Sequence, residues 1–156
     1  MTGIDRAMMA RDNRRISIRL ELKANQLLAR LGLTAGQAHV LLFLIHHRDQ
    51  GASLTDIHRA MDISMPSLSG VVKRLREKDY VRAERRAGDD RYKLFFPTAR
   101  GEELRDTLED SLRMVGETLY RSFTPEELVT LDRLQKKMLF NLCPNDQRNH
   151  KEETQA

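Results

Sequence analysis

The sequence holds few of the residues on which several classes of protein depend. Its 156 residues include a single cysteine, Cys143, which excludes a disulfide within the chain and a zinc site built from several cysteines. The longest fully apolar run, residues 40–45, is far too short to cross a membrane, and residues 1–15 carry four arginines without the apolar core of a signal peptide. We therefore expect a cytoplasmic protein with no membrane partner, in which Cys143 is a small apolar residue at a helix end.

Enzyme motifs and metal-ligand spacings are also missing. The chain contains no glycine-rich phosphate loop, no nucleophile beside a suitable base and no pair of carboxylates that stands apart from helix-end acids. Five histidines are spread along the chain, and adjacent His46 and His47 would point in different directions from a helix, without a cysteine or glutamate at a ligand spacing. The sequence thus predicts a protein that is not an enzyme and that uses no metal or cofactor.

What the chain does contain is basic charge in one place. Over its full length, 27 Lys and Arg stand against 23 Asp and Glu, a net charge of +4. Residues 73–93 alone hold nine basic and five acidic residues, which is also +4, so the rest of the chain sums to zero. A positive field confined to one segment is typical of a surface that binds a polyanion, whereas a single charged helix or hairpin would be ordinary solvated surface.

The length suits one folded domain, and 40% apolar with 32% charged residues is typical of a globular protein. Apolar residues spaced by three and four predict a first helix from Ile16 to Leu31, which Gly32 ends. Thr34 is a suitable N-cap for a second helix, which extends to about Arg48 and is apolar on nearly all sides. That pattern predicts a buried central helix.

Two short helices joined by a tight turn follow. Ser53 or Leu54 begins the first, and Ser64 caps the second, which carries Pro66 in its first turn, where a helix tolerates proline. The apolar positions of the second helix fall on one face and its small polar and basic residues on the other. This order predicts a helix-turn-helix.

Beyond residue 79 the pattern changes to short runs of β-branched, aromatic and charged residues, 80–86 and 92–96, separated by a Gly/Asp tip, and this predicts a β-hairpin. Thr98 then caps one long helix, and Thr124 caps a last helix that stops before Pro144. Residues 144–156 are polar, and we expect a disordered tail. The predicted fold class is mainly α with a small β-hairpin wing, a winged helix-turn-helix with long terminal helices.

The second helix of the helix-turn-helix is suited to B-DNA. Small side chains at its start permit close approach to base edges in the major groove, while Lys and Arg further along reach phosphates. The hairpin beside it can deliver Arg91 to the minor groove, whose negative potential attracts guanidinium groups. The predicted DNA-binding residues are Ser64, Pro66, Ser67, Ser69, Gly70, Lys73, Arg74, Arg86, Asp89 and Arg91.

Taken together, these residues resemble the MarR family of winged-helix transcriptional regulators. The resemblance runs from about residue 16 to residue 142, and its most selective part is the wing-tip motif Asp-x-Arg at residues 89–91, followed by Thr98 and Gly101. Two positions depart from the family pattern: Asp79 stands where glycine is common, and Pro97 where leucine is usual. Asp tolerates left-handed backbone, and Pro lacks only an N–H at a strand end, so neither departure threatens the fold.

The resemblance implies a repressor of a pseudo-palindromic operator, released by a small-molecule effector. It places the effector in a cleft between the first, second and fifth predicted helices, without naming the ligand-binding residues. It also implies that Arg91 enters the minor groove and that Asp89 holds it through a charge-assisted pair. An aspartate at a hairpin tip is equally at home as a turn residue, so both readings of Asp89 stay open.

The long helices outside the winged-helix lobe predict a homodimer. The lobe, about residues 34–98, leaves helices at about 14–31 and 98–142 to form an interface within one domain of residues 1–143, and a two-fold dimer would present two recognition helices to successive major grooves. The alternative is that the same apolar residues pack within their own chain. The predicted dimer residues are Leu27, Leu31, Leu112, Val115, Leu119, Leu128, Leu131, Leu134 and Met138.

Two functions fit the sequence. The first is a homodimeric, sequence-specific transcriptional regulator that binds double-stranded DNA. The alternative is a winged-helix interaction module whose basic face binds an acidic protein partner. Because phosphate binding weakens steeply with salt, retention on random duplex DNA at increasing salt distinguishes the two.

Overall fold

The computed structural model describes residues 3–86 and 88–143, without the side chains of residues 86 and 89–91. Three sets of predictions lie outside the described residues: the disordered tail 144–156, Ala87 at the hairpin tip, and the side chains of Arg86, Asp89 and Arg91. The chain divides into two compact units, Met1–Gly116 and Glu117–Ala156.

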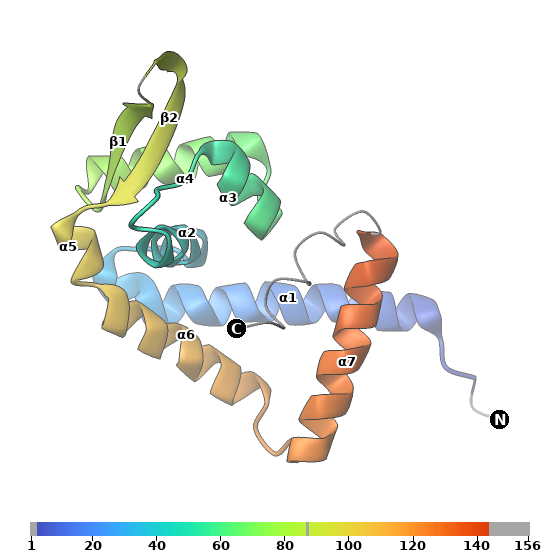
Figure 1. Cartoon of the computed structure of the whole chain (residues 1–156). Helices are drawn as coiled ribbons and strands as arrows, with labels where there is room; N and C mark the ends of the chain where they lie inside the picture. Colours follow the sequence, from blue (N-terminus) through green and yellow to red (C-terminus); the bar gives the residue numbers. More distant parts are fainter. Residues whose placement is uncertain (1–2, 87, 144–156) are drawn as a thin grey trace. The chain divides into compact units, whose positions relative to one another are not determined.

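The first unit contains the winged-helix lobe. The helix α2 lies at its centre, with α1 along one side and the helix-turn-helix on the other, while the hairpin stands next to the recognition helix α4 (Figure 1). The predicted fold class, mainly helical with a two-stranded wing, is confirmed. The elements are α1 (Arg6–Leu28), η1 (Ala29–Leu31), α2 (Ala35–His46), α3 (Leu54–Met61), α4 (Met65–Glu77), β1 (Val81–Arg86), β2 (Asp89–Pro97), α5 (Ala99–Glu102) and α6 (Arg105–Leu119), which runs into the second unit.

The helices of the lobe begin where the sequence predicts them, because their caps are local. Thr34 Oγ1 accepts from the backbone N–H of Gln37, whose side chain accepts in turn from the N–H of Thr34, both at 3.2 Å. Ser53 and Asp56 form the same reciprocal box at the start of α3. Ser64 accepts from the N–H of Ser67 at the start of α4. Each box satisfies N–H groups that a helix start otherwise leaves without partners.

The core of the lobe is centred on α2, as its apolar pattern predicts. Val40, Leu41 and Leu44 are completely buried, together with Leu28 from α1 and Leu68 from α4. Among the described residues, no single helix has the length and apolar composition needed to cross a membrane; α1 with η1 and α2 meet that test only as a pair, bent by 74° between them.

Two helix predictions are wrong in their bounds. The first helix begins at Arg6, ten residues before Ile16, because Asp5 Oδ1 accepts from the N–H groups of residues 7 and 8 at 2.9 and 3.3 Å. The predicted helix after Thr98 is two helices, α5 and α6. Between them the N–H of Leu104 donates to the carbonyl of Gly101, three residues back, so a tight turn replaces a helical one.

The wing is an antiparallel hairpin anchored at its base. Val81 pairs with Pro97 and Ala83 with Phe95, and β2 begins at residue 89 rather than 92 as predicted. Ala52, just before α3, adds a bridge to Phe95 through hydrogen bonds of 3.1 and 2.8 Å. Val81 and Phe95 are buried, so the base of the hairpin is part of the lobe.

The second unit contains α7 (Pro125–Leu142), which Thr124 caps as predicted, through a reciprocal box with Glu127. No residue of α7 is buried, and Val129 and Leu142 are 71% and 78% exposed. Within its own unit, α7 therefore leaves apolar side chains exposed.

Candidate nucleic-acid interface

The recognition helix α4 has one face in the core and one face open. Leu68, Val72 and Leu75 are buried and Val71 is half-buried, as the sequence predicts. The opposite face is exposed. It carries the small residues and two basic residues that the sequence singles out: Ser67, Ser69, Gly70, Lys73 and Arg74.

The start of α4 is compact. Ser64 Oγ accepts from the N–H of Ser67 and donates to its hydroxyl at 2.9 Å, and Pro66 occupies the first turn. Both serines and the proline are exposed, and no long side chain stands among them except Met65. The positive end of the helix dipole is therefore accessible to an anionic surface.

Gly70 is the residue of the exposed face of α4 that has no side chain. A Cβ atom built on Gly70 would have no neighbour within 4 Å, so the fold does not require a glycine at this position. Gly101 is the opposite case, since a Cβ there would lie 2.2 Å from the carbonyl oxygen of Tyr80. At Gly70 the fold therefore has room for a side chain that the sequence does not supply.

Basic side chains flank the open face where α4 meets the wing. An open hollow of about 570 Å³ is lined by three basic residues, Lys73 and Arg76 of α4 and Arg82 of β1, and by the acidic Glu77. Arg82 pairs with Glu84 and lies over the ring of Phe96, 4.6 Å from its centroid, which fixes the guanidinium on the side of the wing. Arg76 and Arg82, which the sequence analysis did not include among the DNA-binding residues, thus lie beside Lys73.

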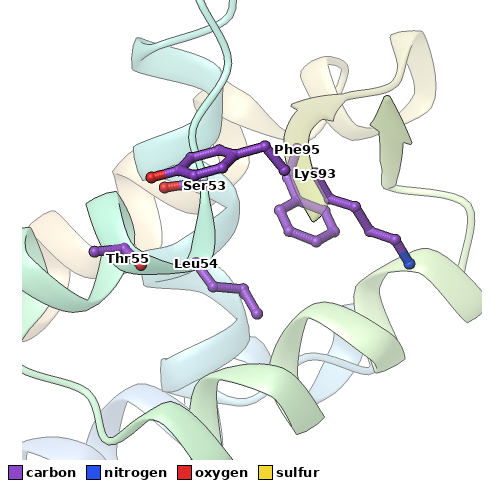
Figure 2. A pocket seen from close by; sticks show the side chains of 6 residues that line it. Ser53, Leu54, Thr55, Lys93 and Phe95 are labelled. Carbon is purple, nitrogen blue, oxygen red and sulfur yellow. The ribbon is translucent and has the colours of Figure 1, made fainter. Parts of the chain in front are cut away.

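A second hollow, of about 260 Å³, lies where α3 meets the wing (Figure 2). Ser53 and Thr55 approach it from the start of α3, and Tyr92, Lys93 and Phe95 from β2. Ser53 already serves as the cap of α3, and its backbone N–H, donating to Asp56, is the main reason that the pKa of Asp56 is lowered. Of the polar residues that line this hollow, Ser53 is thus engaged in the start of α3.

At the tip of the wing, residues 86 and 89–91 are described by their backbone alone. Arg86 ends β1 and pairs with Asp89, with an irregularity in the register between Arg85 and Arg86. Arg91 follows two residues later in β2. The minor-groove role of Arg91 and its pairing with Asp89 stay predictions, since these side chains lie outside the described residues.

The predicted dimer residues do not form a uniform set. Val115 is 9% exposed within the core of its own lobe, and Leu27, Leu31 and Leu112 pack against that core, as the intramolecular alternative has it. Leu119 and Leu131 are half-buried. Leu128, Leu134 and Met138 are exposed, and so are apolar residues that the sequence analysis did not include: Ile4, Met8, Met9, Ile16, Ile18, Leu22, Val129, Leu139, Phe140 and Leu142.

His46 and His58 have different hydrogen-bond partners. His46 Nε2 is 3.2 Å from Glu109 Oε1, to which Arg105 also donates, and these two partners, His46 first, lower the pKa of Glu109. His58 Nδ1 contacts the carbonyl of Ile63 at 2.6 Å, within the turn of the helix-turn-helix. In residues 3–86 and 88–143 no three His, Cys, Asp or Glu side chains gather closely enough to hold a metal ion.

The chain was compared with known proteins first by sequence. The MarR family model matches residues 31–91, which span the second helix to the wing. The comparison with curated protein sequences finds no match.

Solved structures match nearly the whole chain. S. aureus MepR in complex with DNA has a TM-score of 0.80 and 25% identity, covering 89% of this chain and 99% of that chain. A SlyA-like transcription regulator from Listeria monocytogenes, described as uncharacterized, has a TM-score of 0.80 and 22% identity, covering 97% of both chains. A cysteine-to-serine mutant of MarR from E. coli, complexed with operator DNA, has a TM-score of 0.76 and 21% identity, covering 84% of this chain and 93% of that one.

The family model agrees with the resemblance found in the sequence over the helix-turn-helix and the wing, and the solved structures share the fold over most of the chain. The MarR family model thus covers the winged-helix lobe of this chain, and the fold of the chain is that of solved MarR-family transcriptional regulators.

Proposed function

We propose that this protein is a homodimeric, sequence-specific DNA-binding transcriptional regulator, a repressor of a pseudo-palindromic operator that a small-molecule effector releases. It acts without enzymatic chemistry, in the cytoplasm, where the DNA is. The observation that carries the proposal is the open face of α4, where small residues surround an unfilled position at Gly70 and basic residues stand beside the wing. Relatives of the same fold include MepR in complex with DNA and MarR in complex with operator DNA.

The division of labour follows from side-chain size and charge. Ser67, Ser69 and Gly70 are short enough for α4 to approach base edges in the major groove. Lys73 and Arg74, further along the helix, hold phosphates, and we add Arg76 because it borders the same hollow as Lys73. Ser64 and Pro66 lie at the start of the helix, where the dipole favours a phosphate, and Arg86 extends the contact along the wing.

Dimerisation is supported by the apolar residues that the chain leaves uncovered. On α7, Leu128, Leu134 and Met138 are about 40% exposed and Leu139 and Phe140 more so. Complete burial of a fully exposed side chain of this kind contributes roughly 1.5–3 kcal/mol, and these side chains would contribute about half of that, so several together are needed to offset the cost of association. A second copy of the chain is the occupant that the two recognition helices of a palindromic operator require.

Salt dependence tests the DNA-binding proposal. Binding of the full-length protein to random duplex DNA and to a duplex selected from a random library is measured between about 50 and 200 mM salt, where six to ten phosphate contacts weaken binding by about 10³–10⁵. A preference for the selected duplex together with that slope supports the proposal. Binding that is absent, or that is insensitive to salt, favours the acidic-protein alternative.

Arg91 provides a narrower test. If it inserts into the minor groove, Arg91→Ala costs roughly 1–3 kcal/mol per half-site and lowers the salt slope, and Arg91→Lys recovers only part of the loss, since ammonium is harder to desolvate. If Arg91 only braces the wing through Asp89, then Asp89→Ala, Arg91→Ala and the double change weaken binding equally. A near-zero effect of Arg91→Ala would remove the wing from recognition.

A further inference from the structure

The turn after the recognition helix, residues 78–80, is tied to a distant part of the chain. Lys78 is the C-cap of α4, and its Nζ donates to the carbonyl oxygen of Gly32, 46 residues earlier. Gly32 has left-handed backbone, with φ 67°, and forms the corner between η1 and α2. One hydrogen bond therefore joins the end of α4 to the end of η1, the short helix that continues α1.

The chemistry of this contact suits a tether. Carbonyl groups at the C-terminal end of a helix lack partners within it and carry partial negative charge, so an ammonium group is a favourable neighbour. A charge-assisted hydrogen bond is also stronger than a neutral one. Lys78 is half-buried, and a Cβ built on Gly36 would lie 4.0 Å from Val71 Cγ2, so the start of α2 packs against α4 close to the tether.

The same turn is held from a second side. Asp79, with φ 62°, and Tyr80 offer their carbonyl oxygens to Thr98, which donates its hydroxyl to the first at 2.6 Å and its N–H to the second at 3.0 Å. Gly101 presses directly on the carbonyl of Tyr80. The end of α1, the end of α4 and the start of α5 thus meet at three consecutive residues, about 20 Å along the helix axis from the Ser64 cap.

We propose that Lys78 is a positioning residue: its bond to Gly32 fixes the angle between α4 and α1, and so sets the half-site spacing that the dimer accepts. The inference rests on the proposed function. In a dimer built on the terminal helices, the distance between the two recognition helices depends on the angle between the axes of α4 and α1 in each copy. Leu68, Val72 and Leu75 hold α4 against the core along its length, and the Lys78 bond restrains its C-terminal end against the corner at Gly32. Loss of that restraint would change the tilt of α4 at the bases, and half-site spacing is a geometric property of such dimers.

The test compares matched lysine variants on DNA of altered spacing. A duplex selected by the wild-type protein from a random library is remade with one base pair added or removed between its half-sites. We expect Lys78→Met to bind the selected duplex about tenfold more weakly, as loss of one charge-assisted bond predicts, with an unchanged salt slope. Its preference over the respaced duplexes should fall to within about threefold, while Lys78→Arg, which can still donate to Gly32, keeps the wild-type preference.

The control is Lys73→Met on the exposed face of α4, which should lower the salt slope and leave the spacing preference intact. A lowered salt slope for Lys78→Met would make Lys78 a phosphate contact and overturn the assignment. An unchanged spacing preference would overturn it as well.

A measurement without DNA separates this inference from the proposed function. Hydrogen exchange in the free protein should quicken in Lys78→Met at the amides of residues 29–34 and 75–80 together, since the tether restrains both. Equal exchange in wild type and variant overturns the tether even if the protein selects no duplex at all. Failure of both Lys78→Met and Lys78→Gln to fold would make Lys78 a stability residue and would also overturn the proposal.

Discussion

The winged-helix lobe buries its apolar side chains, whereas the terminal helices leave many of theirs exposed. In the lobe, Leu41, Leu44 and Leu75 are fully buried by neighbours from the same chain. On the terminal helices, Met8 of α1 and Phe140 of α7 are more than half exposed, and α7 buries no residue. The comparison teaches that one copy of the chain is enough to build the core of the lobe, whereas the terminal helices keep exposed apolar residues, which the proposed dimer would cover.

Removing α7 should have the largest effect on this contrast. A chain that ends at Phe123 keeps every buried residue of the lobe but loses Leu128, Leu134 and Met138. We expect a folded lobe by circular dichroism, monomers or aggregates by sedimentation, and no operator binding, because two half-sites then bind independently. A chain that ends at Cys143 is the control and should behave as the full-length protein. A dimer that survives the loss of α7 would contradict the division between lobe and terminal helices.

The next largest effect concerns the open face of α4. Gly70→Leu places a bulky side chain where the lobe has nothing within 4 Å, so stability to urea should hold or rise by roughly 0.5–1 kcal/mol, since leucine favours a helix more than glycine does. Binding to the selected duplex should fall about 10³-fold, to the level of random DNA. Equal losses on selected and random duplexes would show that Gly70 is not at the base edges.

Gly101→Ala tests the tight packing inside the lobe. Its Cβ would lie 2.2 Å from the Tyr80 carbonyl oxygen, a backbone atom that cannot turn away. We expect a loss of about 2–4 kcal/mol in the free energy of unfolding, as overpacking in a core produces. Gly116→Ala, in α6 with nothing within 4 Å of its Cβ, is the matched control and should be neutral or slightly stabilising. Similar urea midpoints for the two variants would contradict this account.

The smallest effect is at a helix cap and depends on pH. Asp56→Ala removes the carboxylate that accepts from the Ser53 N–H, and we expect a cost of about 1 kcal/mol at pH 7. Because the pKa of Asp56 is lowered in the folded state, the charged carboxylate stabilises the protein above the ordinary carboxyl range, and this contribution is lost as the pH falls through the lowered pKa. The difference from wild type in urea titrations should therefore shrink in acid. Asp49→Ala, outside any helix, should change stability by less than about 0.5 kcal/mol at either pH.

Sequence reasoning succeeds where the determinant of structure is local. Thr34, Ser53, Ser64 and Thr124 were all predictable as caps because the groups that they satisfy lie within three residues. The inward face of α4 was predictable because its apolar spacing is regular. The early start of α1 could have been found from Asp5, but the mixed polar and apolar residues that follow it hide the helical stripe.

The remaining features depend on contacts that no local pattern encodes. The close approach of Gly101 to the carbonyl of Tyr80 joins two positions 21 residues apart in the chain. The Lys78 bond to Gly32 likewise spans 46 residues. Val115 carries the same apolar signal as Leu134, yet the first is buried in its own lobe and the second is exposed, so a stripe alone does not distinguish a core residue from a residue left for a partner.

The capping boxes also bear on the order in which the molecule assembles. Each of them closes within three residues, and the wing is a hairpin between neighbouring strands, so the first steps of folding require only short loops to close. Chains dominated by such local pairing fold quickly, because little loop-closure entropy is lost before contacts form. If the protein dimerises as proposed, the lobe should therefore be native before two chains meet, and association should be a separate second-order step whose rate rises with protein concentration.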